Sequence, residues 1–172
     1  YLIWSINAYS KSFFFFFLNE IIINPYQTKF NKKAFSSCLL KHLIFESSTT
    51  SIKQFDFKLF GQLNNIIIPE TVISIDENSF TGLSSLTDIT IPDSVKSIES
   101  KSFSGCTSLK EIIIPNSVSI INDNSFYGCT SLEKISLPNT ILSIGNMCFY
   151  ECSSLKQLTL PESLESIKDR TF

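Results

Sequence analysis

The sequence predicts a mainly β solenoid of about seven coils, each 22 or 23 residues long. An aliphatic residue followed by proline recurs every 23 residues, at Pro69, Pro92, Pro115, Pro138 and Pro161. Phenylalanine recurs at the same interval, at Phe57, Phe80, Phe103, Phe126, Phe149 and Phe172. A fixed period of this length indicates stacked repeats, whose faces form long surfaces rather than single catalytic clefts.

Each coil is predicted to begin with a short strand. In the coil 109–131, Leu109, Ile112 and Ile114 are apolar, and their alternation and β-branched character are typical of a strand. Pro115 then ends the strand, because proline lacks a backbone donor and fixes φ. The strands of successive coils are therefore expected to form one parallel sheet on one face of the solenoid.

The rest of each coil is predicted to turn twice before the next strand. Asn116-Ser117 favours a turn, because such side chains bond nearby backbone amides. A second extended piece, which can form a short second strand, carries Val118 and Ile121, and the stretch around Phe126 then bends back as a short helical turn. The core positions of this coil are Leu109, Ile112, Ile114, Val118, Ile121, Phe126 and Cys129, and equivalent residues recur in coils 86–108 and 132–154.

The repeats differ in regularity along the chain. Residues 57–172 carry regular repeats, whereas residues 13–56 carry degenerate repeats in the same phase, with Asn24 and Glu46 at the proline position. Residues 1–12 match no coil position and are interpreted as a partial coil. Burial of one coil's side chains does not offset the entropy of ordering about 23 residues, so 13–172 is predicted to be one elongated domain.

The string Leu-x-x-Ile-x-Ile-Pro-x-Ser-Val-x-x-Ile-x-x-x-x-Phe-x-Gly-Cys-x-Ser resembles the BspA-like leucine-rich repeats. These 23-residue units occur in surface antigens of bacteria and parasitic protists. The resemblance implies a horseshoe-like or gently curved solenoid that binds host or matrix proteins, at the cell surface or after secretion. Two departures affect single coils: serine replaces the usual alanine at Ser79, Ser102 and Ser125, and Glu151 replaces glycine.

An intracellular leucine-rich-repeat scaffold or regulatory module, using the same face for a protein partner, is the alternative interpretation. The chain has no N-x-Ser/Thr sequon, which disfavours a heavily N-glycosylated ectodomain. The localisation is therefore left open between the cell surface and the cytoplasm.

Composition and motifs argue against several other classes. A net charge of −2 and a single arginine provide no electrostatic footprint for nucleic acid. The apolar run 13–18 is too short to span a bilayer, so direct membrane insertion is not expected. Phosphate-binding glycine loops, G-x-S-x-G and H-E-x-x-H are all missing, so neither an enzyme nor a cofactor is expected.

The cysteines repeat with the coils and are expected to be structural. Cys106, Cys129 and Cys152 share one core position, where free cysteine serves as a small hydrophobe, with a disulfide between coils as the alternative. No metal site is expected, because no C-x-x-C pair occurs and His42 is the only histidine. Cys148 stands where other regular coils have Ser or Thr and is expected to be partly exposed.

Outward residues of the predicted strands should align in three columns. The first is Lys41, Asn64, Thr87, Lys110, Glu133, Lys156; the second is His42, Asn65, Asp88, Glu111, Lys134, Gln157; the third is Ile22, Ile44, Ile67, Thr90, Ile113, Ser136, Thr159. The charged columns are interpreted as a solubilising ladder in which Lys110 pairs with Glu133. The isoleucines form an apolar stripe typical of interaction surfaces, although β-propensity also explains them.

These columns supply the candidate protein-binding residues. They are Ile22, Ile44, Ile67, Asp88, Thr90, Lys110, Glu111, Ile113, Glu133, Lys134, Lys156 and Gln157. A second association site is expected at the last coil, where the sequence stops at Phe172 and leaves apolar residues such as Leu160 and Ile167 uncovered. An uncovered coil is both an apolar patch and an open sheet edge, which favours self-association.

Overall fold

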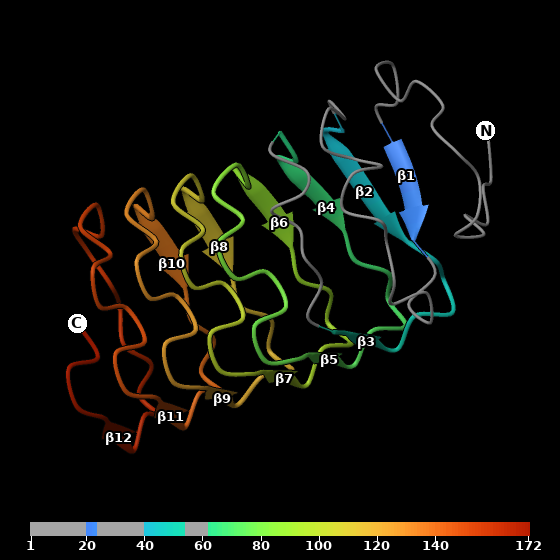
Figure 1. Ribbon diagram of the computed structural model, residues 1–172. Helices are drawn as coiled ribbons and strands as arrows, with labels where there is room; N and C mark the ends of the chain where they lie inside the picture. The colour runs from blue at the N-terminus through green and yellow to red at the C-terminus, as the bar shows by residue number, and fades with distance from the viewer. Residues whose placement is uncertain (1–19, 24–39, 54–61) are drawn as a thin grey trace.

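The computed structural model, which describes residues 20–23, 40–53 and 62–172, is a solenoid of coils stacked side by side (Figure 1). One face carries β1 (Glu20–Ile23), β2 (His42–Phe45), β4 (Asn65–Ile67), β6 (Asp88–Thr90), β8 (Glu111–Ile113) and β10 (Lys134–Ser136). We call the outward side of these strands, continued over residues 156–159, the strand face. Every pairing between these strands is parallel, as predicted.

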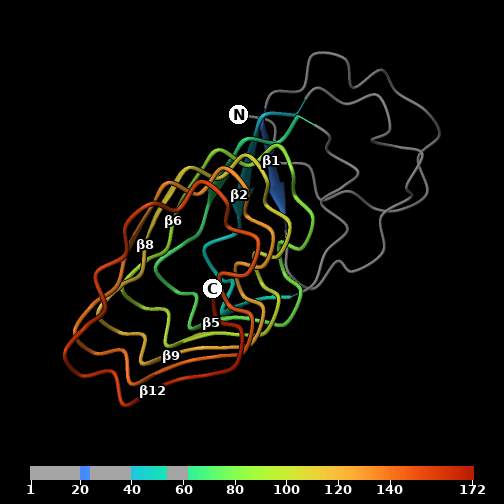
Figure 2. The ribbon, with the colours of Figure 1, turned by 90° about the vertical axis from the view of Figure 1, so that its left-hand side faces the viewer.

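A second parallel sheet lies along another side of the stack. It consists of two-residue strands: β3 (Ser51–Ile52), β5 (Ser74–Ile75), β7 (Ser97–Ile98), β9 (Ile120–Ile121), β11 (Ser143–Ile144) and β12 (Ser166–Ile167). Viewed along the stack, the coils follow one another as similar closed outlines (Figure 2). The part described without a gap, residues 62–172, has about five turns, and strands of two further coils precede it. The sequence predicted about seven coils.

The third side of each coil is closed by turns, and the described residues contain no helix there. Backbone amides on this side bond the next coil: Phe80 donates to the Ser102 carbonyl at 2.7 Å, and Phe103 donates to that of Ser125 at 2.8 Å. Non-glycine residues such as Lys101 and Asn124 adopt φ near +58° and +57° in these turns. The alternative of short second strands or turns, rather than long helices, is therefore confirmed.

The core lies between the three sides and follows the predicted positions closely. All seven predicted core residues of the coil 109–131 are buried, and so are those of the coil 86–108. The phenylalanines stack from coil to coil, with ring centroids 5.2 Å apart for Phe80 and Phe103 and 5.3 Å apart for Phe103 and Phe126. Stacking at these distances adds to the area burial that holds neighbouring coils together.

The turn after each proline also joins coils. The Val118 amide donates to the Pro115 carbonyl at 3.1 Å, which closes the predicted turn. Turn hydroxyls reach the preceding coil instead of nearby amides, because Thr140 donates to the Val118 carbonyl at 2.8 Å. The prediction of a turn is confirmed, and the role given to its hydroxyl is corrected.

The serine that precedes the core phenylalanine provides a second set of hydrogen bonds between coils. The Ser79 hydroxyl donates to the carbonyls of Ile52 and Asp76, both at 2.6 Å, and Ser125 bonds Glu99 and Asn122 likewise. The equivalent hydroxyl of Ser102 is buried without a partner. The departures from alanine thus fit the coil, because the buried hydroxyls of Ser79 and Ser125 find carbonyl acceptors.

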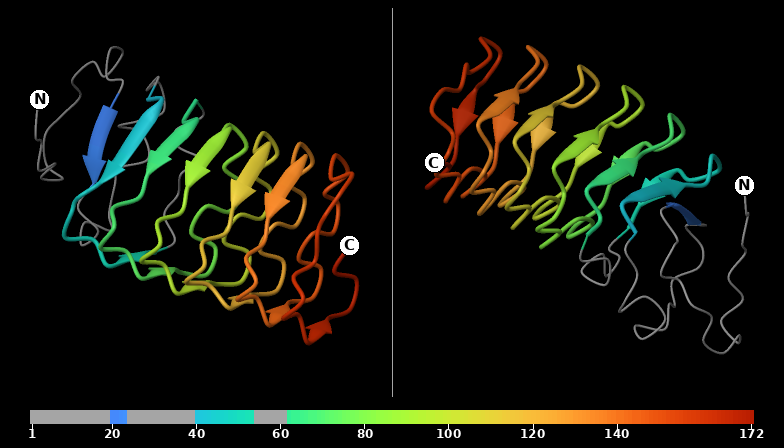
Figure 3. Two further views of the ribbon diagram at one scale, coloured as in Figure 1. Left: turned by 180° about the vertical axis from the view of Figure 1, so that it is seen from behind. Right: turned by 90° about the horizontal axis from the view of Figure 1, so that it is seen from above.

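The last coil is less buried than the others. Its residues Leu155, Leu158 and Leu164 are partly buried, whereas Leu160 and Ile167 are exposed. This coil is the last of the stack, with a neighbouring coil on one side only (Figure 3). Leu137, predicted to be in the core, is also only partly buried and packs at its margin.

Candidate functional site

The strand register brings the predicted outward columns together. Ile22 pairs with Ile44, Ile44 with Ile67, and Ile67 with Thr90. In the second column Asn65 pairs with Asp88, and Glu111 pairs with Lys134. The period therefore predicted which outward residues are neighbours across the strand face.

The isoleucine column is exposed but not continuous. Ile113 is 70% exposed, Ile67 is 50% exposed and Ile22 is 40% exposed, whereas Ile44 is partly buried. Thr90 separates Ile67 from Ile113, and the ladder of hydrogen-bonded strands is interrupted between β6 and β8. The apolar stripe is thus confined to β1, β2 and β4, and Ile113 stands alone among polar residues.

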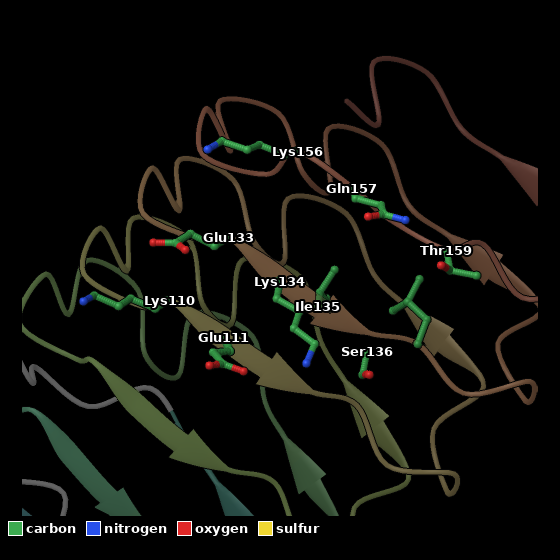
Figure 4. A pocket seen from close by; sticks show the side chains of 10 residues that line it. Lys110, Glu111, Glu133, Lys134, Ile135, Ser136, Lys156, Gln157 and Thr159 are labelled. Carbon is green, nitrogen blue, oxygen red and sulfur yellow. The ribbon is translucent and has the colours of Figure 1, made fainter.

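A hollow of about 690 Å³ lies on the strand face over β8, β10 and the coil that follows (Figure 4). Its lining contains six of the predicted binding residues: Lys110, Glu111, Glu133, Lys134, Lys156 and Gln157. Ser136 and Thr159 add hydroxyl groups to the same lining. The charged half of the predicted site is therefore one concave surface, next to the exposed Ile113.

The charged groups around this hollow are unpaired. Their side chains form no hydrogen bond or ion pair with any described residue, although Glu111 and Lys134 are partners in the register. In particular, Lys110 and Glu133, which directly precede β8 and β10, do not form the predicted ion pair. All five charged side chains are exposed, so their hydrogen-bonding capacity is open to a partner.

The described cysteines are buried and form no disulfide, so they are not part of the exposed strand face. The thiols of Cys106, Cys129 and Cys152 donate to the carbonyls of Phe80, Phe103 and Phe126 at 3.3, 3.2 and 3.1 Å. Burial raises the pKa of the Cys106 thiol to about 12. The reduced ladder is therefore the arrangement that the described residues adopt; Cys38 lies outside them.

Cys148 differs from its prediction. Its side chain is fully buried rather than partly exposed, and burial raises the pKa of its thiol. Cys152 is the least buried of the four described cysteines, at 8% exposed. Cys152 is therefore the described thiol that is most accessible to a reagent.

Sequence reasoning missed two features of the other sides. On the second sheet, Ile73, Ile120 and Leu142 are exposed, and Ile120 replaces the serine found at this strand position in the other coils. On the turn side the rings of Tyr127 and Tyr150 stack, with centroids 5.8 Å apart. The substitution at Ile120 and the repeated tyrosine were visible signals for both.

The described residues contain no group of three or more His, Cys, Asp or Glu placed to hold a metal ion. They also contain no helix with the length and hydropathy that a membrane crossing needs.

Comparisons with known proteins agree with this solenoid architecture. The family model of the BspA-type leucine-rich repeat region matches the chain in six copies, over residues 5–89 and 74–172. A leucine-rich-repeat protein of T. pallidum aligns with a TM-score of 0.57 and 24% identity, covering 80% of this chain and 78% of its own. One from Eubacterium ventriosum aligns with a TM-score of 0.59 and 17% identity, covering 87% of this chain and 56% of its own. No curated protein matches the sequence.

Proposed function

Because the chain belongs to the family of BspA-type leucine-rich repeat proteins, we propose that it is the protein-binding part of a cell-surface antigen or adhesin. In this proposal the strand face contacts host or matrix proteins. The fold itself is a repeat scaffold, and the surface role is the extension that the family resemblance supports.

The observation that carries the proposal is the strand face itself. It combines a hollow, five charged side chains that have no partner among the described residues, and Ile113 exposed at 70% beside them. Protein interfaces combine an apolar contact with a polar rim, and exposed side chains without hydrogen-bond or ion-pair partners among the described residues can contribute to both.

Two substitutions on one coil test the use of this face. Ile113→Lys alters the strand face, whereas Ile120→Lys makes the same change on the second sheet, where Ile120 is 47% exposed. We expect Ile113→Lys to reduce binding of the purified chain to host cells or matrix extract by about tenfold, as loss of a contact worth 1.4 kcal/mol would. Ile120→Lys should bind like the wild type. The opposite ranking, or equal binding by all three, would refute the role of the strand face.

An intracellular protein-binding scaffold is the second candidate. Four free, buried cysteines and the lack of a sequon favour it, since disulfides and glycans belong to oxidising compartments. Labelling intact cells with an antibody to residues 57–172 separates the two. Labelling that requires permeabilisation would exclude the adhesin and leave the scaffold.

A further inference from the structure

The charges of the strand face follow a two-row pattern. The first row is Lys110, Glu133 and Lys156, and the second is Glu111, Lys134 and Gln157. Each residue of the first row directly precedes a residue of the second row in the sequence. The first two coils therefore carry a pair of opposite charges, and the last coil carries the amine of Lys156 beside the amide of Gln157. The rows also alternate from strand to strand, since Lys134 pairs in register with Glu111.

This pattern is its own complement. Consider a second copy generated by a rotation of 180° about an axis that runs parallel to the stack, above the strand face and between the two rows. In this copy the two rows have exchanged places, and each strand lies opposite its own equivalent. A second copy placed face to face in this way sets Lys110 opposite Glu111 and Glu133 opposite Lys134. An interface of this kind is isologous, because the same patch serves both partners.

The neighbouring coils agree with the same rotation. It sets Thr87 opposite Asp88 and Asn64 opposite Asn65, and both pairs can share hydrogen bonds. Lys41 and His42 form the one pair without a complementary group. The match therefore extends over β4, β6, β8 and β10 and ends at β2.

The free charges and the hollow leave room for such a partner. The side chains in both rows make no hydrogen bond or ion pair within the described chain, and they line the 690 Å³ hollow, so their charges face a partner placed over it. With three lysines against two glutamates, the hollow attracts neither a strongly acidic nor a strongly basic protein at long range. It favours a surface whose charges alternate with the same spacing.

We propose that the strand face binds a second copy of this chain, as a two-fold pair whose solenoid axes run parallel. This inference rests on the proposed function, because it names a partner for the same face. The parallel arrangement follows from the symmetry axis, since a rotation about the stack direction does not reverse that direction. Copies on one cell surface would have the same orientation.

A charge exchange on β10 tests the pairing by sedimentation equilibrium of the whole chain. We expect a monomer–dimer equilibrium that weakens with added salt, because salt screens exposed charges. Glu133→Lys and Lys134→Glu each place like charges opposite each other and should weaken the dimer about tenfold or more. The double variant Glu133→Lys/Lys134→Glu restores opposite charges and should return the dissociation constant to within about threefold of the wild type. Lys96→Glu, an exposed reversal beyond the strand face, is the matched control and should change nothing.

Three results would overturn the inference: a monomeric wild type at all accessible concentrations, a double variant no better than the single ones, or association unaffected by any reversal. The last result would place the contact elsewhere, for example at the apolar side of the last coil. None of them touches the proposed function, which is tested separately by the binding of Ile113→Lys and Ile120→Lys to host cells and matrix and by antibody labelling of intact cells.

Discussion

The backbone of Gly145 lies directly against Asp123 of the preceding coil. A Cβ placed on Gly145 would come within 2.5 Å of both the Asp123 amide nitrogen and its Oδ1 atom. That Oδ1 accepts a hydrogen bond of 2.7 Å from the Asn146 amide, so the carboxylate is held in place. Gly145 is therefore required for space: the two coils approach too closely for any side chain.

Gly145→Ala is expected to destabilise the solenoid by about 1–3 kcal/mol, the usual cost of inserting a methyl group into a packed site. Urea unfolding followed by circular dichroism measures the change in the free energy of unfolding. Lys168→Ala is the control, because residue 168 is the equivalent position of the next coil and its side chain is exposed. An unchanged midpoint for Gly145→Ala would mean that the coils are further apart than described.

Glu151→Gly should have the opposite effect on stability. Glu151 stands at a position held by glycine in the three preceding coils and adopts φ of 62°, where a side chain costs roughly 1 kcal/mol. Replacement by glycine is expected to raise the free energy of unfolding by up to about that amount, less what is lost with its contact to Tyr127. A fall of 1 kcal/mol or more would show that the contact outweighs the strain.

The same substitution should change the titration of Tyr127. A hydrogen bond to the Glu151 carboxylate raises the pKa of the Tyr127 hydroxyl above its usual value of 10. In Glu151→Gly this pKa should fall towards the ordinary value, so phenolate appears at lower pH. The raised pKa favours the folded state below the ordinary pKa, and this stabilisation is lost as the pH rises through the folded value. Tyrosine resonances followed by NMR over a pH titration of the wild type and the variant measure the change.

Adjacent isoleucines of β8 should differ sharply in their effect on stability. Ile112 is 2% exposed and Ile113 is 70% exposed. Ile112→Ala is expected to cost about 2–5 kcal/mol, as buried aliphatic truncations do. Ile113→Ala should cost under about 1 kcal/mol, within the range of β-propensity. Denaturant unfolding of both variants checks this, and equal losses would show that the inward and outward positions are misassigned.

Thiol titration tests the cysteine ladder. In the native protein we expect one or two reactive groups, with Cys152 first, because it is the most exposed of the described cysteines. Cys106 and Cys148 should stay unreactive, because burial raises their pKa values and hides them from the reagent. After unfolding without reductant all five cysteines should react; fewer than four would reveal disulfides.

The sequence by itself determined the solenoid, its register and most of its core. A shift of 23 residues relates Ile66 to Ile89 and Ile112 to Ile135, and these are the pairs that the strands form. This works because parallel stacking places equivalent positions side by side, so a period in the sequence becomes a contact in space. The outward columns of the candidate binding face follow from the same relation.

Only the tertiary structure decided how individual side chains use those positions. Cys148 is buried despite standing in a serine position, and the equivalent Ser79, Ser102 and Ser125 are buried as well, so the position is inward whatever its polarity. The β6–β8 interruption, the hydroxyl bonds of Ser125 to the preceding coil and the unpaired Lys110 and Glu133 leave no mark in the period. A repeat specifies which residues are equivalent. Whether two side chains form a hydrogen bond or an ion pair depends on differences in distance of a few tenths of an ångström, and these are set only by the packing of the coils.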